Sequence, residues 1–253
     1  MRDNLGSAVN RGARAMPPHR ARQRPTAFAQ KPFVNGAQSV GEVIAYSAAA
    51  RVDADFAVGG WPKRAFDIVV SSVALVVLAP LLLLIAVAVR FDSPGRSIFR
   101  QERGGFRGKS FRIWKFRTMT VMENRGIVQA RRNDARITEL GAFLRRSSLD
   151  ELPQLFNVLM GDMSIIGPRP HALEHDAQFE TVDPRYTDRF RARPGVTGLA
   201  QVSGCRGPTE TDEKIRARTA HDLDYVQNWS WMKDATILVR TASMFWTTDT
   251  AAL

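Results

Sequence analysis

Residues 68–89 read IVVSSVALVVLAPLLLLIAVAV, a run of about 22 residues that contains no charged side chain. As a continuous helix this stretch would be about 33 Å long, which is enough to cross the hydrocarbon core of a bilayer. Pro80 lies near its middle, and a proline inside a helix removes a hydrogen bond and clashes with the preceding turn. The stretch therefore predicts an apolar helix with a sharp bend near Pro80.

Basic residues flank the apolar run on both sides: Lys63 and Arg64 precede it, and Arg90, Arg96, Arg100 and Arg103 follow it. A helix that crosses a membrane once leaves its positive charge mainly on the cytoplasmic side. A hairpin that enters and leaves on that side satisfies both flanks, provided that protein covers its break. From the residues alone, a spanning helix and a re-entrant hairpin are both open, and a buried helix of a soluble protein is the third alternative.

The composition narrows the classes of partner. The chain has 253 residues, 44% of them hydrophobic, and a formal net charge of +11, which favours nucleic acid, anionic lipid or phosphorylated substrates. It has no zinc-finger, helix-turn-helix or RNP-like pattern, and the apolar run argues against nucleic acid. One cysteine excludes an internal disulfide framework and fits a reducing compartment. No apolar stretch follows Met1, so we expect any membrane segment to be internal.

Three regions are expected along the chain. Residues 1–60 are rich in arginine and proline and predict a basic, mobile tail, with a possible short helix at 40–50. Residues 61–91 hold the apolar segment, and residues 92–253 form the third region, which carries the candidate site residues. Within this last region we expect two strands around a turn at 97–117 and helices at 149–160, 211–228 and 232–246.

An adjacent pair of carboxylates, Asp150 and Glu151, opens an apolar helical pattern two residues after Ser148. The pattern S-x-x-E also fits a capping box, which needs no function. The functional alternative rests on the two preceding arginines, Arg145 and Arg146, which would keep a carboxylate ionised, as a nucleophile requires. The neighbouring carboxylate could hold Mg²⁺ that bridges to substrate phosphates.

Other basic residues are candidate phosphate ligands. Two prolines restrain the backbone around Arg169, whose guanidinium suits bidentate phosphate contact; a rigid connector is the alternative. Lys115 and Arg117 would share one face of a strand, and a solvated sheet face is the usual explanation of such a pair.

Two local patterns are rejected. Gly108-Lys109-Ser110 lacks the first glycine and the strand-to-helix context of a phosphate-binding loop. The sequence from His171 to His175 matches H-x-x-E-H, but the chain has four histidines and no further cluster of zinc ligands, so a polar helix start is favoured.

Six motifs between Lys63 and Trp246 resemble the bacterial polyprenyl-phosphate sugar-1-phosphate transferases, known as monotopic phosphoglycosyl transferases. In chain order they are KRAFD at 63–67, KFRTM at 115–119, SLDELPQLFN at 148–157, GDMSIIGPRP at 161–170, RPGVTG at 193–198 and YVQNWS at 225–230. The first 60 residues lie outside the resemblance.

The resemblance implies a reaction and its residues. A UDP-sugar would give its sugar-1-phosphate to undecaprenyl phosphate and release UMP. Asp150 would be the nucleophile that forms an aspartyl-phosphosugar intermediate, and Glu151 would carry Mg²⁺. Residues expected near the phosphates are Lys115, Arg117, Arg145, Arg169 and Arg193.

The resemblance also implies an α+β, mostly helical fold with a re-entrant membrane helix that breaks at Pro80 and amphipathic interfacial helices near the C-terminus. The catalytic domain would face the cytoplasm at the bacterial inner membrane, at the first membrane step of exopolysaccharide assembly. The segment 201–211 looks more like members that use UDP-glucose than like those that use UDP-galactose. A membrane-anchored scaffold without turnover is the alternative of another class.

Overall fold

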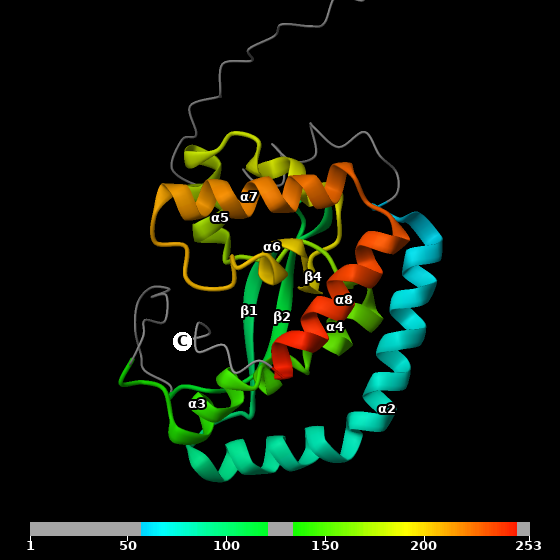
Figure 1. Cartoon of the computed structure of the whole chain (residues 1–253). Helices are drawn as coiled ribbons and strands as arrows, with labels where there is room; N and C mark the ends of the chain where they lie inside the picture. Colours follow the sequence, from blue (N-terminus) through cyan, green and yellow to red (C-terminus); the bar gives the residue numbers. More distant parts are fainter. Residues whose placement is uncertain (1–56, 121–133, 247–253) are drawn as a thin grey trace, which may run out of the picture. The chain divides into compact units, whose positions relative to one another are not determined.

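The computed structural model describes residues 57–120 and 134–246, all of which belong to one compact unit. The arrangement is α+β and mostly helical, as the sequence predicts (Figure 1). The helices are α2 (Gly60–Asp92), α3 (Glu139–Arg146), α4 (Gln154–Met160), α5 (Leu173–Val182), α6 (Leu199–Val202), α7 (Asp212–Gln227) and α8 (Trp231–Trp246), with 3₁₀ turns η1 (Phe106–Gly108), η2 (Leu149–Glu151) and η3 (Tyr186–Arg191). The strands are β1 (Ile98–Gly104), β2 (Ser110–Phe116), β3 (Ser164–Ile166) and β4 (Gly195–Thr197).

Helix α2 carries the apolar run, with Pro80 in its interior, and it changes direction along its length (Figure 1). Before Pro80, Val70 and Leu78 pack on a core cluster that includes Val158 of α4. After Pro80, Ile85 packs on a second cluster around Leu144 of α3. We call the part of α2 before Pro80 the first arm and the part after it the second arm. The two arms therefore pack on different parts of the protein. Many other apolar side chains of the helix are exposed: Val69, Val73, Val76, Val77, Leu83, Leu84 and Val87. By length and composition this helix could cross a membrane.

The first arm of α2 is fastened by buried polar contacts. Lys63 Nζ lies 2.6 Å from Asp234 Oδ2 of α8, and both side chains are buried. Asp67 Oδ1 accepts hydrogen bonds from Ser164 Oγ and from the Ile165 amide of β3, each at 3.0 Å. A buried charge is costly unless it is paired, so these contacts specify where this end of the helix sits.

The second arm is fastened by a different set of residues. Arg117 donates from Nη2 to the carbonyl oxygens of Val89 and Ser93, at 3.1 and 2.5 Å, and from Nη1 to that of Arg96, at 2.9 Å. The Val89 and Ser93 carbonyls lie at the C-terminal end of the helix, where carbonyls have no partner within it, and Arg96 lies in the turn that follows. Ser97 Oγ donates to the carbonyl oxygen of Ala86 at 2.6 Å. Both ends of α2 are thus bonded to the same folded body.

Strands β1 and β2 form an antiparallel hairpin in which Phe99 is opposite Lys115 and Arg103 is opposite Phe111. This confirms the two strands predicted at 97–117. Helix α4 is tied to the hairpin by Asn157, whose Oδ1 accepts from the Trp114 amide at 2.9 Å and whose Nδ2 donates to the Arg112 carbonyl at 2.8 Å.

Strands β3 and β4 form a short parallel pair that brings two sequence motifs together. Ser164 is paired with Gly195, and Ile166 with Thr197. The backbones approach so closely that a Cβ atom on Gly195 would lie 2.1 Å from the Gly167 amide nitrogen. Glycine is therefore required here, and the 161–170 and 193–198 motifs form one structural unit.

Two helices confirm their predictions, and one prediction is wrong. Helix α7 is close to the predicted 211–228, with Thr211 as its cap, and α8 is close to 232–246. The continuous helix expected at 149–160 is broken: η2 ends at Glu151, and α4 begins at Gln154 after Pro153. The possible helix at 40–50 lies outside the described residues.

Candidate active site

Asp150 and Glu151 lie in the 3₁₀ turn η2, between α3 and α4. Ser148, just before the turn, has a left-handed backbone with φ 57°, whereas a capping serine has an extended one. Its side chain makes no capping bond and accepts a hydrogen bond from Arg206 Nη2. The capping-box interpretation of the pair is therefore wrong, because the turn that holds the carboxylates is separate from the helix that follows.

Glu151 is held by two cations from different elements. Lys115 Nζ of β2 donates to Glu151 Oε1 at 2.7 Å. Arg169 donates from Nη2 to Oε1 at 2.6 Å and from Nη1 to Oε2 at 3.2 Å, a forked arrangement typical of arginine and carboxylate. Burial alone would raise the pKa of Glu151, but Arg169 and Lys115 outweigh it and hold that pKa well below its usual range. Glu151 is therefore ionised at neutral pH.

Asp150 has a different environment, although it is the next residue. Its side chain is buried, with 8% of the residue's surface exposed, and the bonds from Lys115 and Arg169 go to Glu151. No other described residue donates a hydrogen bond to its carboxyl group. Burial, together with the charge of Glu151, raises the pKa of Asp150 to about 6. A carboxylate of this kind is ionised at neutral pH and is more basic than an exposed one, which suits a nucleophile.

Arg145 and Arg169 act on Asp150 through charge. Both lower the pKa of Asp150, against the effects of burial and of Glu151. Arg145 itself is held by a hydrogen bond from its Nε to Thr118 Oγ1 at 2.9 Å. The structure thus brings Lys115, Arg145 and Arg169 to the carboxylate pair.

The guanidinium groups of Arg117 and Arg193 bond to other parts of the protein than the carboxylate pair. Arg117 is buried, and its guanidinium binds the end of α2, so that Lys115 and Arg117 do not form the cationic or solvated strand face that alternation predicted. The Arg117 amide still donates to the Ser97 carbonyl at 2.8 Å, but its guanidinium meets the carbonyls of Val89 and Ser93, which strand alternation does not encode. Arg193 Nε donates to the carbonyl oxygen of Gly161, the residue that ends α4, at 3.0 Å. A role of either arginine in phosphate binding stays a prediction.

Arg206 is a cation near the pair that the sequence did not single out. It lies between α6 and α7, and it reaches Ser148, two residues before Asp150. The separation along the chain is 58 residues, and no local pattern marks such a contact. The 201–211 segment contains one arginine, Arg206 itself, so its composition gave no signal either.

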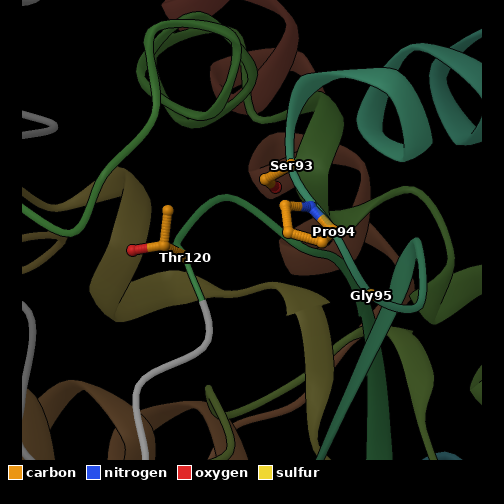
Figure 2. A pocket seen from close by; sticks show the side chains of 4 residues that line it. All are labelled: Ser93, Pro94, Gly95 and Thr120. Atoms are coloured by element: carbon orange, nitrogen blue, oxygen red, sulfur yellow. The ribbon is translucent and has the colours of Figure 1, made fainter.

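The described residues also line a pocket of about 430 Å³, and neither Asp150 nor Glu151 is among its lining residues. Figure 2 shows its lining residues, Ser93, Pro94 and Gly95 from the turn after α2, and Thr120 after β2. Thr120 is the last residue described before position 134.

The donors present at η2 fit a magnesium ion only with help from a substrate. Within the described residues no group of three or more His, Cys, Asp or Glu side chains gathers, so the protein offers two adjacent carboxylates. Mg²⁺ is commonly bound by one or two carboxylates together with substrate phosphates and water. Both oxygens of Glu151 now face Lys115 or Arg169, and these cations would have to turn toward phosphate oxygens when the metal binds.

Comparison with known proteins places the chain in a family. The model of the bacterial sugar transferase family matches residues 58–248. A UDP-glucose:undecaprenyl-phosphate glucose-1-phosphate transferase of Caulobacter vibrioides is 51% identical over 190 residues, which are 75% of this chain and 71% of that protein. A protein of the same name from Klebsiella pneumoniae is 51% identical over 180 residues, 71% of this chain but 39% of that protein.

A third relative bears a different name. The exopolysaccharide production protein PSS of Rhizobium leguminosarum is 49% identical over 184 residues, 71% of this chain and 92% of its own length. The residues that the family model matches, 58–248, include the carboxylate pair, the cations around it and the apolar helix. The chain belongs to the bacterial sugar transferase family.

Proposed function

We propose that this protein transfers glucose-1-phosphate from UDP-glucose to undecaprenyl phosphate and releases UMP. The observation that carries the proposal is the pair Asp150–Glu151: one carboxylate is neutralised by two cations, and its neighbour is buried, ionisable and without a hydrogen-bond donor among the described residues. The donor and acceptor are those named for the Caulobacter and Klebsiella relatives.

In the first step, an oxygen of Asp150 attacks the β-phosphorus of UDP-glucose. A phosphorus–oxygen bond forms, the bond to the bridging oxygen breaks, and UMP leaves with that electron pair. In the second step, a phosphate oxygen of undecaprenyl phosphate attacks the same phosphorus and displaces the Asp150 carboxylate. A covalent intermediate lets a water-soluble donor and a membrane-bound acceptor use one site in turn. With a pKa of about 6, about nine-tenths of Asp150 is ionised at pH 7.

In the proposed reaction, Lys115 and Arg169 bind the phosphates of the donor. Lys115 and Arg169 now neutralise Glu151, and they would turn to the diphosphate of the donor, where positioning and charge neutralisation are the main contributions to catalysis. Glu151, with Asp150 beside it, would hold Mg²⁺. The chemistry that this ion supplies when bound is neutralisation of charge on the phosphate oxygens.

The same proposal includes a re-entrant α2. A straight helix of 33 residues would be about 50 Å long and would carry its two ends to opposite sides of a bilayer. Here Lys63 near one end binds Asp234, and the carbonyls at the other end bind Arg117, within one folded body. A polar body of this kind cannot lie on both sides of the membrane, which supports entry and exit on one face. That face would be the cytoplasmic face of the inner membrane, where UDP-sugars are made.

Purified full-length protein, undecaprenyl phosphate, Mg²⁺ and a panel of UDP-sugars test the proposal. UMP release with UDP-glucose is expected, together with an intact mass increased by a hexose phosphate when the acceptor is omitted. Asp150→Asn should abolish both. Release with UDP-galactose alone would keep the reaction class and change the sugar. Folded protein that releases UMP from no donor and gains no mass would contradict the proposal in favour of a scaffold.

A further inference from the structure

Residues 168–171 carry Arg169 to the carboxylate pair, and all four of their carbonyl oxygens are held by other parts of the protein. The Gly195 amide donates to Pro168 O at 2.9 Å, and the Gly104 amide donates to His171 O at 3.3 Å. Arg103 Nη1 donates to Pro170 O at 3.3 Å. Arg189 Nη2 donates to the carbonyl oxygen of Arg169 itself. The two prolines offer no amide hydrogen, so these acceptor bonds decide where the main chain lies.

Arg189 is the most connected of these donors. It lies in η3, and 2% of its side chain is exposed. Its Nε donates to Asp222 Oδ2 of α7 at 3.0 Å, and its Nη2 lies 2.8 Å from the same oxygen. Its Nη1 donates to Tyr186 Oη at 2.9 Å. One planar guanidinium therefore joins η3, α7 and the main chain of Arg169, which a single lysine ammonium could not match in geometry.

The hydroxyl of Tyr186 completes the support. Its oxygen lies 2.6 Å from His171 Nδ1 and donates to Asp176 Oδ1. Burial and the neighbouring Arg189 and Arg218 hold the pKa of His171 well below its usual range, so the imidazole is neutral. Arg218 Nη1, a donor, lies 3.2 Å from His171 Nε2. Nε2 then accepts from Arg218. Nδ1 lies 2.6 Å from Tyr186 Oη and 3.2 Å from Arg189 Nη1, so His171 also contacts the guanidinium of Arg189.

We propose that Arg189 is a positioning residue that acts through Arg169: by fixing the Arg169 carbonyl from behind, it sets where the Arg169 guanidinium meets Glu151 and, in turn, the phosphates of the donor. The inference deepens the proposed function and rests on it for its kinetic consequence. Arg189 itself is bonded to neither Asp150 nor Glu151. Its effect on the reaction is indirect, and displacement of a phosphate-binding group by about 1 Å can cost up to about a hundredfold in rate.

The test compares three substitutions in the full-length protein. Arg189→Lys keeps the charge and loses the fork. Tyr186→Phe keeps Arg189 and removes the hydroxyl that accepts from its Nη1. This variant replaces Arg189→Lys in the test if the lysine variant does not fold. Arg185→Lys is the matched control: Arg185 is exposed, lies four residues earlier, and pairs with Asp183 away from the 168–171 segment. Each substitution is made in the natural protein and again with Arg169→Lys, and kcat/KM for UDP-glucose is measured by UMP release.

We expect Arg189→Lys to lower kcat/KM by about tenfold when Arg169 is present and by less than twofold when Arg169 is already lysine, because both changes act on one interaction. Tyr186→Phe should follow the same pattern with a smaller loss of kcat/KM. Arg185→Lys should leave kcat/KM unchanged in both backgrounds. Equal losses in both backgrounds would mean that Arg189 only supports folding, and would overturn the proposal.

A structural measurement separates this inference from the proposed reaction. A structure of the Arg189→Lys protein gives the distance from Arg169 Nη2 to Glu151 Oε1, which is 2.6 Å in the natural protein. A longer or broken contact is expected. An unchanged contact would refute the positioning role even if no UDP-sugar were turned over, whereas failure of the natural protein to release UMP would count against the reaction alone.

Discussion

Asp150 and Glu151 are adjacent in the chain, but the pKa values of their carboxyl groups are shifted in opposite directions. Burial and the charge of Glu151 raise that of Asp150 to about 6, whereas Arg169 and Lys115 hold that of Glu151 far below its usual range. Two carboxylates whose environments separate their pKa values in this way commonly have different roles in catalysis. Here the difference arises because both cations bond to one of the two residues.

The first prediction concerns the pH dependence of the reaction. Asp150 attacks only as a carboxylate, so the rate should fall as the pH falls through about 6. Between pH 7 and pH 5 the ionised fraction drops from about nine-tenths to about one-tenth. Single-turnover UMP release at saturating UDP-glucose should therefore slow by about tenfold over this range. The far-ultraviolet circular dichroism must be constant over the same range, and a flat rate profile would exclude Asp150 as the titrating nucleophile.

The second prediction concerns Lys115. Its positive charge lowers the pKa of Asp150, so Lys115→Met should move the acid limb of the rate profile to higher pH. The maximum rate should fall as well, because a phosphate partner is lost. Lys109→Met is the control, since Lys109 lies in the same hairpin, just before β2, and is exposed. A limb that stays in place in the Lys115 variant, or that moves equally in both, would argue against electrostatic control of Asp150 by Lys115.

The sequence was most informative where the pattern is local. The apolar run, the hairpin around Gly104 and Gly108 and the helices near 212–227 and 231–246 follow from composition and periodicity alone. The carboxylate pair was found, but its setting was not, because a left-handed serine and a proline divide the expected helix into a turn and a shorter helix. The backbone conformation of Ser148 depends on a tertiary environment that includes Arg206, 58 residues away.

Arginine is the residue type whose role the sequence predicted least well. Four arginines that lie within or close to sequence motifs have four different partners. Arg117 binds a helix end, and Arg169 binds a carboxylate. Arg189 belongs to a buried network, and Arg193 binds a glycine carbonyl. A guanidinium reaches far from its Cα atom and pairs with whatever acceptor the fold brings near. Strand alternation predicted a cationic or solvated face for Arg117, but its guanidinium is buried against the carbonyls of Val89 and Ser93.

The third prediction follows from the position of Arg117. Arg117→Met removes two hydrogen bonds from the C-terminal end of α2 and one from Arg96, just after it. The substitution should lower the free energy of unfolding of the detergent-solubilised protein by about 2 kcal/mol or more. The value of kcat/KM per folded molecule should change by less than twofold. Arg112→Met is the control, because Arg112 lies five residues earlier, in β2, and its side chain is 70% exposed.

The opposite result is equally informative for Arg117. A variant of unchanged stability whose kcat/KM for UDP-glucose falls by tenfold or more would restore the predicted phosphate-binding role. It would also mean that the bonds to the end of α2 contribute little to the stability of the fold.

The last prediction concerns the membrane topology of α2. Because both of its ends bond to one folded body, single cysteines at Trp61 and Arg96, on a Cys205→Ser background, should both react with a membrane-impermeant maleimide only after the inner membrane is opened. Both positions are exposed in the structure. Replacing Pro80 by leucine restores an amide hydrogen and removes the clash with the preceding turn, so it favours a straight helix. A straight α2 cannot keep both ends on one body, and we therefore expect the Pro80→Leu protein either to expose the Trp61 cysteine on the periplasmic side of intact cells or to lose the Lys63–Asp234 pairing and with it much of its stability. Labelling of either cysteine in intact cells that carry the natural Pro80 would show that the helix spans the membrane, and the re-entrant arrangement would have to be abandoned.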